Sequence, residues 1–175
     1  MKINIPIGYF ALVLILAVGI ATGCIRSQDK EYGGKGEILH IGAHEPKLMD
    51  EVIYSIKEQN YVIAAQGEGN KIAALRARAV NLTSTQIILS VDETVITLNS
   101  KDGVEFKPLE PDTIEVETKE DAPEGNPYSS HIWGTLKLNK GFEMSGWLFF
   151  EVPKGTEFAN IVWDTVEFVR VIYPH

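Results

Sequence analysis

Residues 71–81 read KIAALRARAVN, the clearest structural signal in the chain. Arg76 and Arg78 alternate there with Leu75, Ala77 and Ala79, so polarity changes at every residue. A period of two is typical of a half-buried β-strand, whereas an amphipathic helix repeats its apolar residues every three or four positions. The stretch therefore predicts a strand with one face in a hydrophobic core.

Similar short runs, rich in apolar and β-branched residues, lie on both sides of this strand. Turn residues separate them, such as GEGN at residues 67–70 and Asp102-Gly103, a good hairpin turn because glycine accepts a positive φ. Further strands are expected at residues 61–66, 86–91, 94–98, 104–106, 132–138, 142–152, 161–163 and 166–173. About eight strands with frequent turns predict an all-β fold, a sandwich or a barrel.

Two segments fit this pattern less simply. Residues 47–59 place apolar side chains at helical spacing behind Pro46, but Val52, Tyr54 and Ile56 also alternate, and we favour a strand over residues 52–57. Residues 110–124 hold seven acidic residues and one lysine. Because charge and proline protect sheet edges, we expect an edge strand at 113–118 that runs into a loop.

The N-terminal segment indicates export rather than part of the fold. Residues 7–21 (IGYFALVLILAVGIA) are apolar, and Lys2 is the only charge before them. A basic start, an apolar centre and a small-residue end are typical of a secretory signal. The segment ends in Ala21-Thr22-Gly23-Cys24, which resembles the lipobox of bacterial and archaeal lipoproteins, although alanine stands where leucine is commonest. That resemblance implies cleavage before Cys24 and acylation of its thiol.

An uncleaved membrane anchor and plain secretion remain as alternatives to the lipoprotein. The uncharged stretch 3–25 is long enough to span roughly 30 Å of hydrocarbon. All three alternatives place residues 26–175 outside the cytoplasm. The expected organisation is a signal peptide at 1–23, a lipid-anchored flexible tether at 24–36 and one β-sandwich domain at 37–175.

Two further stretches resemble a known family. GNK at residues 69–71 opens the alternating strand to Asn81, and KG at residues 140–141 precedes Gly146 and the run FFEVPKG at residues 149–155. With the Asp102-Gly103 hairpin between them, these motifs resemble the telokin-like family of extracellular immunoglobulin-like domains, over about residues 50–173. The resemblance implies an immunoglobulin-like β-sandwich and no reaction. Trp133, Trp147 and Trp163 are expected to join Phe149 and Phe150 in its core.

No catalytic constellation appears in the sequence. The histidines are His40, His44, His131 and His175; His40 and His44 are four residues apart beside Glu45, but Gly42 and Pro46 disfavour a helix that would align them. No metal site, cofactor or catalytic residue is therefore assigned. The acidic stretch 110–124 lacks EF-hand spacing, so a solvated loop is favoured over a Ca²⁺ site. The sequon at Asn81 is explained equally well by an asparagine that ends a strand.

Charge excludes one class of partner. The chain carries 16 basic and 24 acidic residues, a net charge of −8, which argues against a nucleic-acid binder. We expect a non-catalytic, surface-anchored domain that binds an envelope protein or an extracellular ligand through loops or a strand edge. An accessory subunit of an envelope or transport complex is the first alternative, and a metal-dependent envelope enzyme is the second.

Overall fold

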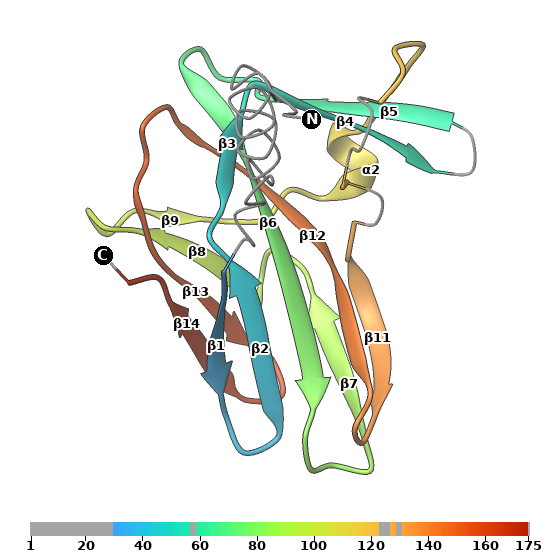
Figure 1. The fold of residues 1–175 in the computed structure, drawn as a ribbon, viewed down its shortest axis with the longest axis vertical. Helices are drawn as coiled ribbons and strands as arrows, with labels where there is room; N and C mark the ends of the chain where they lie inside the picture. Colours follow the sequence, from blue (N-terminus) through green and yellow to red (C-terminus); the bar gives the residue numbers. More distant parts are fainter. Residues whose placement is uncertain (1–29, 57–58, 123–126, 129–130, 175) are drawn as a thin grey trace, which may run out of the picture.

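The computed structural model describes residues 30–56, 59–122, 127–128 and 131–174. The strands are β1 (Glu31–Lys35), β2 (Leu39–His44), β3 (Lys47–Met49), β4 (Glu51–Ile56), β5 (Gln59–Ala64), β6 (Asn70–Asn81), β7 (Gln86–Val91), β8 (Ile96–Ser100), β9 (Glu105–Phe106), β10 (Val116–Thr118), β11 (Gly134–Asn139), β12 (Glu143–Pro153), β13 (Phe158–Asp164) and β14 (Phe168–Ile172). One short helix, α2 (Pro111–Ile114), interrupts them within the described residues. The all-β prediction is confirmed (Figure 1).

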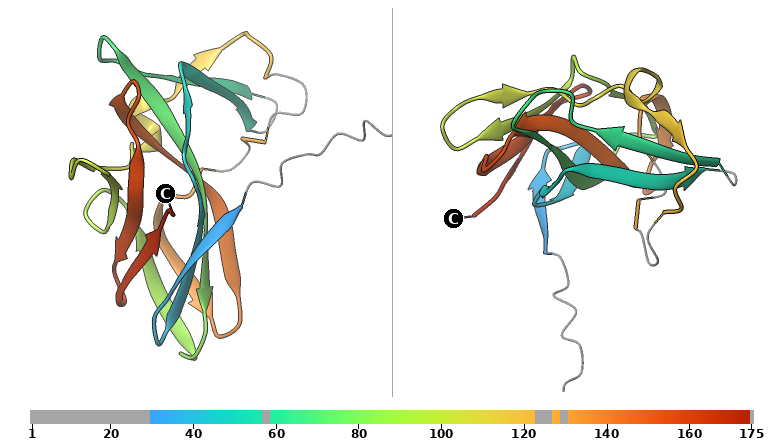
Figure 2. Two further views of the ribbon diagram at one scale, coloured as in Figure 1. Left: turned by 60° about the vertical axis from the view of Figure 1, so that its left-hand side comes forward. Right: turned by 90° about the horizontal axis from the view of Figure 1, so that it is seen from above.

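Two layers of antiparallel strands form the sandwich. One layer has the order β1-β2-β6-β12, and β3 also pairs with β6. The other layer contains β14-β13-β8-β9 and the pair β11-β7. Figure 2 shows β13 and β14 facing β2 and β6 from across the molecule. The sandwich core between the layers is apolar and includes Leu75, Leu148, Phe150 and Trp163, each at most 1% exposed.

β6 and β12 are the two longest strands, and they pair along almost their whole length, from Asn70 with Pro153 to Val80 with Glu143. The alternation in β6 appears as predicted: Leu75, Ala77 and Ala79 are buried, whereas Arg76 and Arg78 face outward. Towards its beginning, β6 is buried on both faces, because Ile72 and Ala74 are covered as well as their neighbours. A further layer must therefore cover the outside of the sheet there.

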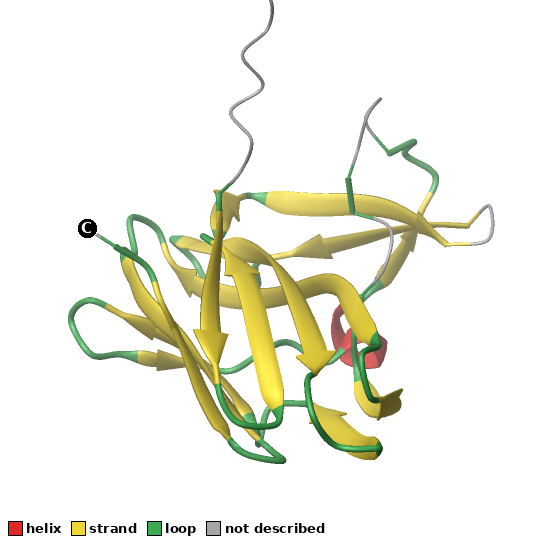
Figure 3. Cartoon of the chain, turned by 60° about the horizontal axis from the view of Figure 1, so that its bottom comes forward, coloured by secondary structure: helices red, strands yellow, loops and turns green. Residues whose placement is uncertain are grey.

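That outer layer consists of β4, β5 and β10, in the order β10-β5-β4. It lies across the ends of β6 and β12 at a steep angle (Figures 1 and 3). A second, smaller core lies beneath it, made of Val52, Tyr54, Ile63, Ile72, Ala74 and Phe149. Consecutive residues of β12 thus enter different cores: Phe149 is buried under the outer layer and Phe150 inside the sandwich.

The two segments with ambiguous patterns, 47–59 and 110–124, have different outcomes. Residues 51–56 form β4, so the strand is confirmed over the helix. The acidic segment is a strand only at Val116–Thr118, where β10 does form the edge of the outer layer. The expectation is wrong for residues 113–115: residues 113 and 114 belong to α2, and Glu115 lies between α2 and β10. Pro111 explains the difference, because its fixed φ suits the first turn of a helix.

The expected tether is also wrong over part of its length. Residues 31–35 are not a flexible linker but β1, which pairs with β2 from Glu31–His44 to Lys35–His40. Two contacts with the other layer attach β1 and the turn that joins it to β2. The backbone of Gly34 packs so closely on Arg170 that an added Cβ would lie 2.3 Å from its carbonyl oxygen. The carboxylate of Glu167 accepts hydrogen bonds from the backbone N–H groups of residues 37, 38 and 39.

The predicted turns and strand end have clear physical roles. Gly103 adopts φ +86° in the β8–β9 hairpin. Pro153 ends β12, and Gly155 follows with φ +86°. Asn81 is completely buried, and its side-chain nitrogen donates to the carbonyls of Ser84 (2.7 Å) and Leu138 (2.9 Å). The strand-ending interpretation of Asn81 is thereby favoured over the sequon, because this nitrogen is inaccessible and already engaged.

Candidate functional site

The residues expected to carry the lipid, Ala21, Thr22, Gly23 and Cys24, lie outside the described residues, as does His175. Within the described part of the chain, no helix has the length and apolar character needed to cross a membrane. The candidate site must therefore be sought in the folded domain.

His40 and His44 do share a face, but through a strand rather than a helix. Both lie on β2, where side chains four residues apart point the same way. Nε2 of His44 lies 3.9 Å from Glu31, whose carboxylate also receives a 2.6 Å hydrogen bond from Arg78. That hydrogen bond lowers the pKa of Glu31. Among the described residues, no three or more histidine, cysteine or acidic side chains gather as a metal site would require.

A different polar group is buried under the outer layer. The Nδ1 atom of His131 lies 3.5 Å from Oε1 of Glu115, and their side chains are 4% and 15% exposed. The hydroxyl of Tyr54, a residue only 1% exposed, is buried in the same small core. Neither nitrogen of His131 nor the Tyr54 hydroxyl has a well-formed hydrogen bond. We call these three residues the buried triad.

Three separate elements supply the buried triad. Tyr54 comes from β4, and Glu115 stands between α2 and β10. His131 precedes β11 and bridges to Trp147 of β12, where the N–H of Ile132 donates to the Trp147 carbonyl at 3.0 Å. The triad therefore joins the outer layer to the sheet beneath it, and it is complete only while that layer is closed.

Burial dominates the electrostatics of the triad. It lowers the pKa of His131, while the neighbouring Glu115 and the Leu109 carbonyl act in the opposite direction. The imidazole is consequently neutral at pH 7. Burial also raises the pKa of Tyr54, and Glu115 adds to the rise, so its hydroxyl remains protonated.

Aromatic rings surround the buried triad. The ring of His131 meets Phe149 edge-on at 5.0 Å, and Tyr54 stacks on Phe149 at 6.3 Å and on Tyr61 at 5.9 Å. Tyr128 packs edge-on against Trp147 at 4.5 Å. These contacts exclude water from the polar atoms, which strengthens every electrostatic interaction among them and makes each unpaired group costly.

The chemistry open to this group is proton uptake and release. A histidine beside a carboxylate can hold or release a proton near neutral pH. The rings of Phe149 and Tyr54 pack in contact around this pair. Protonation of His131 beside Glu115 can therefore change the stability with which the outer layer packs on the sheet.

Sequence reasoning missed this group. In the sequence, His131 stands out only as a candidate metal ligand, and Glu115 is only one of several charges in the expected edge strand. Sixteen residues separate these two, and Tyr54 lies a further 61 residues away in the chain. No spacing motif links them, so only the folding of the outer layer onto β12 brings them together.

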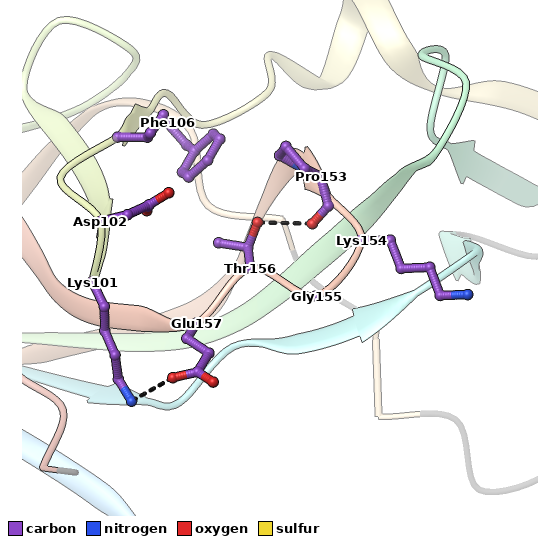
Figure 4. A pocket seen from close by; sticks show the side chains of 9 residues that line it. Lys101, Asp102, Phe106, Pro153, Lys154, Gly155, Thr156 and Glu157 are labelled. Atoms are coloured by element: carbon purple, nitrogen blue, oxygen red, sulfur yellow. Dashed lines mark hydrogen bonds and ion pairs between the residues drawn. The ribbon is translucent and has the colours of Figure 1, made fainter.

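The loops at one end of the sandwich form a second candidate. A cleft of about 420 Å³ lies between the β8–β9 hairpin and the β12–β13 turn (Figure 4). Across it, Lys101 and Glu157 form an ion pair of 2.6 Å, and the Thr156 hydroxyl donates to the Pro153 carbonyl at 2.7 Å. Lys154 points away from the other labelled side chains. The polar groups that line the cleft thus largely satisfy one another.

Comparisons with known proteins give distant structural likeness. Neither a family model nor a curated protein matches the sequence. A solved protein of Bacillus subtilis described as a lipoprotein, YcdA, is 14% identical with a TM-score of 0.46; the match covers 81% of this chain and 38% of that one. The secreted protein MPT63 of Mycobacterium tuberculosis is 13% identical with a TM-score of 0.42, over 83% of this chain and 92% of that one.

The chain therefore spans well under half of the length of the Bacillus protein that it resembles. The fold class therefore rests on the strand pairing of this chain, which forms an all-β sandwich with an added outer layer.

Proposed function

We propose that this protein is a lipid-anchored extracytoplasmic protein whose β-sandwich acts by binding, without catalysis. The signal-like segment 7–21 and the lipobox-like Ala21–Cys24 support the anchor. The domain that follows would face the outside of the cell. The telokin-like resemblance belongs to this proposal, since the run at residues 149–155 forms the end of β12 and its turn as such a domain requires.

The observation that carries the binding role is the outer layer. Its strand β10 is an edge strand among the described residues, paired only with β5. Val116 on β10 is 62% exposed, although it is a β-branched apolar residue in a strand. An open edge with an exposed apolar side chain is a surface on which a partner strand can add by main-chain hydrogen bonds. We therefore place the binding surface at β10.

Intact mass and detergent partition of the protein from cells test the anchor. A mature chain that starts at an acylated Cys24 and enters the detergent phase is expected. Cys24→Ala should remain unprocessed or lose the acyl mass. A full-length mass with residues 1–23 retained would contradict the lipoprotein and identify an uncleaved anchor.

Crosslinking in intact cells tests the binding surface. Val116→Lys should abolish capture of the partner, because a charge would be placed at the edge where the partner strand adds. Ile88→Lys is the matched control, since Ile88 is 60% exposed on β7 and lies away from the outer layer. Capture that survives Val116→Lys would refute the edge as the binding surface. A stoichiometric envelope protein among the captured species would favour the accessory-subunit alternative, whereas a soluble ligand would favour a receptor.

A further inference from the structure

The point where the chain enters the fold lies close to the expected anchor. β1 begins at Glu31, so only the six residues 25–30 separate it from Cys24. Six residues span at most about 20 Å when fully extended. A protein anchored at Cys24 therefore holds its domain against the membrane, instead of carrying it on a long tether. The surface around the start of β1 is the part that must face the lipid.

That surface is the edge where β1 meets β14. The ring of Tyr32 on β1 contacts Tyr173, which directly follows β14, edge-on at 5.7 Å. Figure 1 shows the two strands side by side, with β7 on the opposite side of the molecule. Ile172 is next to Tyr173 in the chain but faces outward, since successive side chains of a strand alternate. Ile172 therefore lies near the start of β1, whereas Phe168 lies at the other end of β14, next to Glu167, which approaches Gly36.

The outward face of β14 is unusually apolar for a surface. Phe168 is 55% exposed and Ile172 is 64% exposed, and Arg170 stands between them. The guanidinium of Arg170 lies 5.3 Å from the centre of the Phe168 ring. Aromatic and aliphatic side chains next to a cation are well suited to the boundary between acyl chains and headgroups.

Charge at this edge is close to balanced, although the protein has a net charge of −8. Three cations, Lys30, Lys35 and Arg170, are found here. Glu31 is ion-paired with Arg78, but Glu167 stays ionised and the exposed Glu37, Glu45 and Asp164 add further negative charge. The apolar side chains of this edge, rather than its charge, therefore carry the contact with a bilayer.

We propose that the β1–β14 edge docks on the membrane that holds the anchor, with Phe168 and Ile172 entering the headgroup boundary. The proposal rests on the proposed membrane attachment near residue 24. Two apolar side chains bind a bilayer weakly by themselves, but attachment raises the effective concentration to the order of millimolar, so weak contacts are sufficient. Docking would fix the orientation of the sandwich on the membrane.

The test places an environment-sensitive thiol fluorophore on the full chain in vesicles of phosphatidylethanolamine and phosphatidylglycerol. Cys24 is the only cysteine, so acylation leaves an introduced thiol as the sole reactive one; for an unacylated chain, a Cys24→Ser background serves the same purpose. The fluorophore is attached at Phe168→Cys or, as matched control, at Ile88→Cys. We expect a blue shift and severalfold quenching by brominated acyl chains at 168, and neither at 88.

The outcomes separate the two proposals. Protein that does not float with the vesicles overturns attachment and docking together. Protein that floats while position 168 behaves like position 88 overturns docking alone. A blue shift at 168 that grows with protein density and is insensitive to brominated lipid shows that a second copy covers the face, and it also overturns lipid docking. As a second measurement, Phe168→Ser with Ile172→Ser should abolish protection of β14 by vesicles from hydrogen exchange, whereas Ile88→Ser should retain it.

Discussion

The two cores of this protein are built on different principles. The sandwich core is large and joins strands of both layers through aliphatic and aromatic side chains. Its buried Asn81 is fully hydrogen-bonded, and the Tyr173 hydroxyl is the one buried tyrosine group described there without a well-formed hydrogen bond. The outer-layer core is small and contains Tyr54, Glu115 and His131 without well-formed hydrogen bonds. Buried polar groups cost free energy unless they are paired. The comparison indicates that the sandwich is the stable unit and that the outer layer is a less stable unit attached to it.

Neighbouring phenylalanines give the largest expected contrast. Phe150→Ala should lower the free energy of global unfolding by about 3–5 kcal/mol, because it leaves a cavity between the two layers of the sandwich. Phe149→Ala should instead remove amide hydrogen-exchange protection from β4 and β5 while β8 and β13 remain protected. Denaturant unfolding and exchange mass spectrometry measure the two effects. Equal loss of protection throughout the domain in Phe149→Ala would show that the two cores unfold together.

The next largest effect is expected at the Glu167 clamp, the three hydrogen bonds by which Glu167 holds the β1–β2 turn and the start of β2. Burial by itself raises the pKa of Glu167, but the backbone N–H groups of Leu39, Ile38 and Glu37 outweigh it and lower the pKa overall. Glu167→Gln should cost about 1–3 kcal/mol, since an amide cannot accept three hydrogen bonds at this site as a carboxylate does. Because the folded pKa is depressed, this stabilisation is present above the unfolded value and is lost as pH falls through the folded one.

Thermal melts at pH 7 and pH 3 check this clamp. Glu105→Gln, at an exposed glutamate of β9, is the control and should melt like the wild type at both pH values. If Glu167→Gln melted like the control at pH 7, the three hydrogen bonds would contribute nothing to the attachment of the β1–β2 turn.

Protonation should open the outer layer without unfolding the sandwich. The pKa of His131 is lowered in the folded protein, so the open state takes up a proton first as pH falls. Stability of the outer layer is therefore complete above the unfolded value of about 6.5 and decreases as pH falls below it. Trp147 packs beside the buried triad, so its fluorescence should report the opening between pH 7.5 and 5.

His131→Phe is the variant that sharpens this test. It removes the titrating group but leaves the buried Glu115 without its histidine partner, so stability of the outer layer at pH 7 should fall by about 1–3 kcal/mol. The pH-dependent fluorescence change should disappear. A wild-type transition that persists in His131→Phe would assign the titration to another group.

The smallest effect is expected at the cleft of the sandwich end. Lys101→Met breaks the ion pair with Glu157, but both side chains are largely exposed, at 39% and 71%. Exposed pairs contribute at most about 1 kcal/mol. A melting temperature close to that of the wild type, at both low and high salt, is the expected result. A loss as large as that of Glu167→Gln would mean that the cleft is part of the stable framework.

Much of the fold could be predicted because local pattern and burial agree there. The alternation at residues 71–81, the Asp102-Gly103 hairpin and the proline that ends β12 each depend on a few adjacent residues. The errors were at residues 31–35 and 113–115. Glycine and charge in the first segment are typical of a linker, whereas Gly34 permits the close packing of β1 on β14. In the acidic segment, Pro111 begins a helical turn, although Ile and Val alternate with Glu over residues 113–118 as in a strand.

The sequence by itself determined that the chain is rich in strands, that one face of β6 is buried, and that an apolar N-terminal segment ends in a cysteine. Each of these properties depends on residues that are close together along the chain. The outer layer, the buried triad and the Glu167 clamp were decided by the tertiary structure alone. Each joins residues that are 16 to 130 positions apart, and such contacts depend on how layers stack, which no local period records.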